Sequence, residues 1–131
     1  MKKLGKRFSN EFRELDVAYF NNCGNASAFL LRKILEKSIF LAFAKNKKIN
    51  ILKEKNSDKF VGLEKMISIA SKEFAKDGTP FILPKVAEKL SSVKFLGDTA
   101  AHDFIYDIDI KDIERELSVI NIGLGQLANK L

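Results

Sequence analysis

Residues 26–46 constrain the fold most, because their apolar side chains cover nearly the whole circumference of a helix. Polar side chains interrupt this stretch in one stripe, which contains Arg32, Lys33, Glu36 and Lys37. Side chains three and four positions apart lie on the same face of a helix, so the other faces stay apolar. Other elements have to cover such a helix on most sides. The sequence therefore predicts a central helix within a bundle.

The rest of the chain repeats the helical spacing of apolar residues, and no run alternates in the way of a half-buried strand. Turn and cap residues divide it into predicted helices over residues 10–23, over 57–78, from residue 84 onward, and over 109–131. Residues 47–57 are polar and rich in lysine, which predicts a long surface loop. We therefore expect an all-α fold, a bundle of four to five helices.

Two of the predicted helices carry a clear apolar face. In helix 57–78 that face comprises Phe60, Leu63, Met66, Ile67, Ala70 and Phe74. In the last helix it comprises Ile110, Ile113, Leu117, Ile120, Leu124, Leu127 and Leu131. Asp109 is suited to cap the last helix, with Asp112 as the second carboxylate of a capping box. We expect this last face to close the core; alternatively, part of it forms a homodimer interface.

The composition fits a single globular domain. The chain has 131 residues, of which 46% are hydrophobic and 31% charged, as in ordinary globular proteins. We expect a flexible basic segment at residues 1–9 and a helical domain over residues 10–131. No apolar run approaches the roughly 20 residues that a spanning helix needs, so no membrane association is expected. Cys23 is the one cysteine, which excludes a disulfide within the chain and favours a cytoplasmic location.

The charge of the chain is compatible with a polyanionic partner. The net charge is +6, and lysine-rich surfaces attract the phosphates of RNA or DNA. The densest cluster consists of Lys45, Lys47, Lys48, Lys53 and Lys55. The alternative is a basic surface that is only solvated.

His102 is the only histidine and the side chain best suited to proton transfer near neutral pH. If the fourth helix continues to about residue 103, then Lys94, Asp98 and His102 are spaced four apart and share one face. Arg32 and Glu36 form a similar pair on the central helix, and a carboxylate often orients a catalytic imidazole. The alternative is that these are ordinary surface pairs. No ligand spacing typical of a metal site and no cofactor motif occurs.

Two segments resemble motifs of the HEPN superfamily. They are residues 31–36, Leu-Arg-Lys-Ile-Leu-Glu, and residues 93–102, Val-Lys-Phe-Leu-Gly-Asp-Thr-Ala-Ala-His. They look most like a branch catalogued as a domain of unknown function that often accompanies restriction and defence enzymes. In that branch a helix with Arg-x-x-Leu-Glu precedes a segment of the form Arg-x-x-Gly-Asn-x-x-Ala-His. The resemblance covers about residues 10–130 and implies a four- to five-helix bundle that is commonly dimeric.

The resemblance also implies a site. Active members of the family cleave RNA without a metal: the histidine serves in proton transfer while the ribose 2′-OH attacks the adjacent phosphate, and the arginine steadies the charge on phosphorus. By position, His102 matches the histidine, Lys94 stands where the arginine is, and Asp98 stands where the asparagine is. Glu36 matches the glutamate of the second helix, and Glu36 and Arg32 are the expected supporting residues of the site.

Two of these matches are departures with physical consequences. Lys94 supplies a point charge where arginine supplies a planar fork that binds phosphate through two hydrogen bonds. The Asp98 carboxylate adds repulsion beside a phosphate, although it favours the charged form of His102. The pattern therefore implies a HEPN-like fold with a degenerate ribonuclease site.

These considerations predict an RNA-binding or partner-binding module of a defence or toxin-type system, with a degenerate metal-independent endoribonuclease site. One alternative is an active endoribonuclease that uses His102. The other is a noncatalytic dimerisation module. The expected partners are accordingly RNA and a second copy of the chain or another protein, with no metal and no cofactor.

Overall fold

The computed structural model of the chain describes residues 2–97 and 107–131. In these residues the α-helices are α1 (Ser9–Phe20), α2 (Gly24–Lys45), α3 (Leu63–Lys72), α4 (Pro84–Ser91) and α6 (Ile110–Ala128). Short 3-10 helices are η1 (Lys2–Phe8), η2 (Ile49–Leu52) and η3 (Lys94–Leu96). The described residues contain isolated β-bridges but no named strand. The predicted all-α bundle is confirmed.

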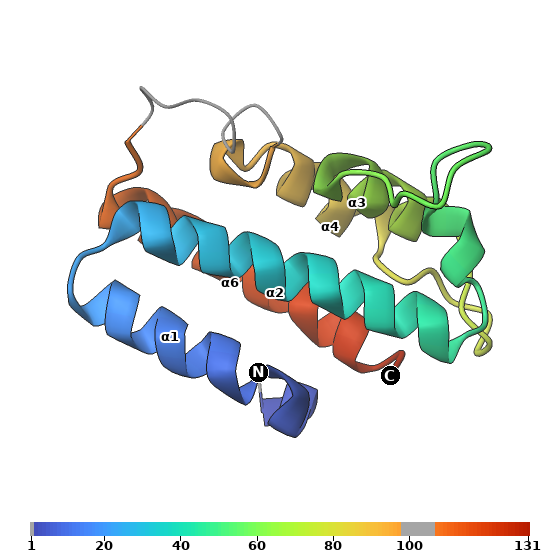
Figure 1. Ribbon diagram of the computed structural model, residues 1–131, viewed down its shortest axis with the longest axis horizontal. Helices are drawn as coiled ribbons and strands as arrows, with labels where there is room; N and C mark the ends of the chain where they lie inside the picture. The colour runs from blue at the N-terminus through green and yellow to red at the C-terminus, as the bar shows by residue number, and fades with distance from the viewer. Residues whose placement is uncertain (1, 98–106) are drawn as a thin grey trace.

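The α2 helix is the centre of the bundle, as its sequence predicts. Figure 1 shows it running the length of the molecule, with α1 antiparallel on one side and α6 alongside. It also contacts α3, and α3 and α4 pack against each other. Leu31, Ile34, Leu35 and Ile39 of α2 have no solvent exposure. The apolar circumference of this helix is therefore covered from several sides.

The α6 helix begins and packs as its sequence predicts. Asp109 and Asp112 form a capping box, in which the Asp109 amide donates to Asp112 Oδ2 at 3.1 Å and the Asp109 side chain accepts from a backbone amide of the first turn. The predicted apolar face lies against the core, with these residues fully or nearly fully buried: Ile113, Ile120, Leu124 and Leu127. This face therefore closes the bundle within the chain.

The third helix is much shorter than predicted, because the chain turns at both of its ends. Lys53 pairs with Phe60 in an antiparallel bridge before α3, and Phe74 pairs with Pro80 after it. Phe60 and Phe74 are consequently 38% and 54% exposed. Their assignment to the core face of one long helix was wrong. Helical spacing of apolar residues does not reveal where such local turns interrupt a helix.

The N-terminal residues 2–8, predicted as part of a flexible basic segment, form η1, and its last residue, Phe8, is fully buried. Lys37 of α2 holds this region. Its Nζ donates to the Arg7 carbonyl at 2.6 Å, pairs with Glu11 Oε1 at 3.3 Å and lies over the Phe8 ring. The helical domain therefore includes Phe8. None of the helices in the described part of the chain has the length and apolar character needed to span a membrane.

Candidate functional site

The α2 helix binds residues 95–97, which belong to the segment 93–102 that resembles the family motif. After α4 ends at Ser91, the chain forms η3, and Phe95 and Leu96 are buried. Arg32 Nη1 donates to the carbonyl oxygen of Gly97 at 2.7 Å and to that of Phe95 at 3.5 Å. Carbonyl groups at the end of a helical turn carry partial negative charge, which a guanidinium complements. Arg32 therefore ties residues 95–97 to α2.

Asn25 of α2 binds Asp107 and Ile108, which follow segment 98–106. Its Oδ1 accepts from the Ile108 amide at 2.8 Å, and its Nδ2 donates to Asp107 Oδ1 at 3.2 Å. Asn25 and Arg32 are seven residues apart, which places them on the same face of a helix at a separation of roughly 10 Å. The residues on either side of segment 98–106 are thus attached to one face of α2.

Gly24 permits this attachment. A Cβ atom at Gly24 would lie 1.7 Å from the Ile108 carbonyl oxygen, so no larger residue fits without displacing the backbone. The sequence shows Gly24 and Asn25 only as a break between two helices. Their contacts with Asp107 and Ile108 could not be inferred from it, because no pattern links positions more than 80 residues apart.

The predicted site residues fall into two groups. Asp98 and His102 lie outside the described residues. Arg32, Glu36 and Lys94 are described, and Glu36 and Lys94 are exposed. The Glu36 side chain makes no hydrogen bond or ion pair with any residue that the structure describes. Of the predicted set, the structure therefore brings together Arg32 and the turn that contains Lys94.

In the described residues, the fourth helix does not continue through Lys94. The α4 helix ends at Ser91 rather than continuing, and Gly97 has an extended conformation with φ −76° and ψ 155°. Lys94 thus belongs to a three-residue turn that stops at Leu96. The condition under which Lys94, Asp98 and His102 would share one face, a fourth helix that continues to about residue 103, is therefore not met at Gly97.

Outside residues 98–106, no group of three or more His, Cys, Asp or Glu side chains is arranged to hold a metal ion. Comparisons of the chain with protein-family models, with curated proteins and with solved structures find no match.

Proposed function

We propose that the chain is a HEPN-like RNA-binding domain of a defence or toxin-type system, with a degenerate metal-independent endoribonuclease site around His102. The observation that carries this proposal is the 2.7 Å hydrogen bond from Arg32 to Gly97. It joins the two segments on which the resemblance to the family rests. In this role Arg32 is a positioning residue, since its guanidinium is engaged by backbone carbonyls.

The residues of the site favour binding over rapid cleavage. His102 is the group that would exchange a proton with the ribose 2′-OH, and Lys94 would face the phosphate as a point charge. A planar two-point contact with the phosphate is then missing, because Arg32 is used to hold Gly97 and Phe95. The Asp98 carboxylate would repel the additional negative charge that develops on the phosphate oxygens in the transition state. Stabilisation of the transition state is therefore expected to be weak.

A second candidate function is a noncatalytic module that assembles with another copy or another protein. It is favoured by large apolar side chains on α1 and α2 that remain in solvent. Phe20 is 78% exposed and Phe29 is 66% exposed. Exposed aromatic residues of this size are frequent at protein interfaces.

Incubation of a labelled single-stranded RNA with the purified chain in EDTA distinguishes the candidates, with His102→Ala as the comparison. The proposal predicts saturable binding with little or no cleavage. Cleavage that His102→Ala abolishes would instead establish the active endoribonuclease. Absence of both binding and cleavage would reject the RNA proposal. A change of oligomeric state in His102→Ala, measured by analytical ultracentrifugation, would then support the assembly module.

A further inference from the structure

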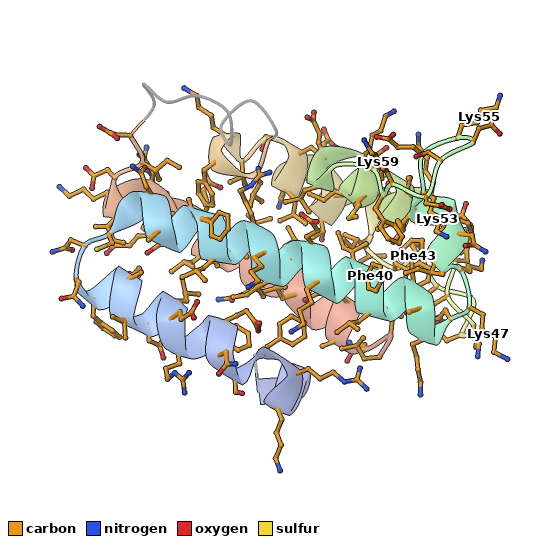
Figure 2. The ribbon with its side chains drawn as sticks, viewed as in Figure 1. Phe40, Phe43, Lys47, Lys53, Lys55 and Lys59 are labelled. Atoms are coloured by element: carbon orange, nitrogen blue, oxygen red, sulfur yellow. The ribbon has the colours of Figure 1, made fainter. Side chains whose placement is uncertain are left out.

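Most of the net charge lies at the end of the molecule where α2 terminates. Between residues 45 and 59 the chain has six lysines and two acidic residues, so this segment carries +4 of the total +6. Figure 2 shows Lys47, Lys53, Lys55 and Lys59 spread over this end of the molecule, with Lys55 and Lys47 at its opposite edges. Charge at this density attracts phosphate groups over the distance of a Debye length.

Two of the six lysines have roles within the fold. Lys45 lies in the last turn of α2, where a cation complements the helix dipole. Lys48 pairs with Glu73 at 3.7 Å. Among the described residues, no ion pair involves the four lysines labelled in Figure 2. These four lysines, Lys47, Lys53, Lys55 and Lys59, therefore carry charge that the described fold does not neutralise.

A turn fixes three of these lysines relative to one another. The Val61 amide donates to the Leu52 carbonyl at 2.8 Å, and the Glu54 amide donates to the Lys59 carbonyl at 2.8 Å. Lys53 and Phe60 face each other across the resulting bridge. Residues 52–61 thus form a closed turn that presents Lys53, Lys55 and Lys59 on a defined backbone.

An aromatic ring lies next to Lys53, in the same turn as Lys55 and Lys59. The Phe60 ring meets Phe40 of α2 edge to face, with centroids 5.1 Å apart, and Lys53 Nζ lies over the Phe60 ring, 5.9 Å from its centroid. A base that stacks on Phe60 would displace this ammonium group toward the phosphates. The Phe40 contact fixes the ring, and 38% of Phe60 remains exposed. A fixed, partly exposed ring in a lysine-rich turn is a combination that binds single strands, because bases stack on the ring while phosphates meet the cations.

We infer that Lys47, Lys53, Lys55, Lys59 and Phe60 form a binding surface for single-stranded RNA, which we call the α2-end surface. It is separate in sequence from the His102 motif and would hold a flanking part of the strand. The inference rests on the proposed function for the identity of the polyanion. Four phosphate contacts would make the affinity fall with salt at a logarithmic slope of about 3.

Fluorescence anisotropy with a labelled single-stranded RNA tests the surface by charge removal. The double variant Lys55→Gln/Lys59→Gln should weaken binding and lower the salt slope by about 1.4. The matched control is Lys6→Gln/Arg7→Gln, which removes the same charge from exposed positions of η1. An equal loss in both variants would overturn the surface, because the effect would then depend only on net charge.

The ring is tested by Phe60→Leu, which keeps an apolar contact with Phe40. If this variant loses the stacking of one base, its affinity for single-stranded RNA should be at least about fivefold weaker. Phe20→Leu, at an exposed position of α1, should leave the affinity unchanged. Duplex RNA, whose base faces are covered, should bind Phe60→Leu and the wild type equally well. An equal loss of affinity for duplex RNA would contradict stacking.

If the wild-type chain does not bind RNA, the proposed function fails. If it binds but all variants behave as wild type, only the α2-end surface fails.

Discussion

Arg32 donates a 2.7 Å hydrogen bond to the carbonyl oxygen of Gly97, which follows it by 65 residues. This bond attaches the turn containing Lys94 to the central helix. Together with Asn25, which accepts from the Ile108 amide at 2.8 Å, it makes α2 the support for the chain on both sides of residues 98–106.

Replacement of Arg32 by methionine should destabilise the fold and weaken RNA binding. Methionine keeps much of the packing but leaves the Gly97 carbonyl without its charged donor. Hydrogen bonds to charged groups contribute about 1.5–3 kcal/mol, and the free energy of unfolding in urea should fall by about that amount. Lys33→Met, an exposed neighbour on the same helix, is the control. If both variants lose the same small amount, Arg32 does not anchor the segment.

Substitution of Gly24 by alanine should destabilise the chain, because the new Cβ overlaps the Ile108 carbonyl oxygen. Overpacking of this kind costs about 1–3 kcal/mol or more. Gly125→Ala is the matched change in α6, where a Cβ meets nothing within 4 Å. There the better helix propensity of alanine should stabilise by about 0.5–1 kcal/mol. Thermal unfolding of the two variants should shift in opposite directions, and a loss in neither would contradict the close approach at Gly24.

Asn46→Ala should cost about 2–4 kcal/mol, measured by urea unfolding. The Asn46 amide is buried, and it donates to the carbonyls of Ala42 and Lys130 and accepts from the Lys76 amide at 2.8 Å. Its removal leaves the Lys76 donor and the Lys130 acceptor unpaired. Asn121→Ala, at an exposed position in α6, should be nearly neutral. Equal stability of the two variants would show that Asn46 does not join these three segments.

Acidification should weaken the contact between Asp77 and the C-terminal end of the chain. Hydrogen bonds from Lys130 and Thr79 hold the pKa of the Asp77 carboxyl well below its usual range. A lowered pKa in the folded state contributes stability above the unfolded pKa of about 4, and this contribution is lost as the pH falls. Asp77→Asn should therefore flatten the fall in unfolding free energy below about pH 5. Lys130→Gln should flatten it too, and an unchanged pH profile in both would contradict the linkage.

The elements that the sequence predicts well are those whose residues act locally. The apolar circumference of α2 and the Asp109–Asp112 capping box depend on neighbours within a few positions, so spacing reveals them. Phe60 was assigned wrongly because a bridge to Lys53 determines its position, and the spacing of apolar residues does not reveal such a bridge.

The candidate site was predictable only in part for the same reason. Spacing and resemblance selected Arg32 and Lys94, but the role of Arg32 depends on carbonyls that come into reach only when η3 packs on α2. Asn25 carries no sequence signal for its contact with Ile108, because an exposed asparagine after a glycine is typical of any turn.

The most direct test of the central claim is the equilibrium affinity of the wild-type chain for a labelled single-stranded RNA in EDTA, with His102→Ala measured beside it. The account predicts saturable binding with a dissociation constant in the micromolar range or tighter. This is at or below the tight end of the range of roughly 1–100 μM that is typical of nonspecific binding. It also predicts a severalfold weaker affinity for His102→Ala. No saturable binding up to about 100 μM, or identical affinities of the two proteins, would contradict an RNA site at His102.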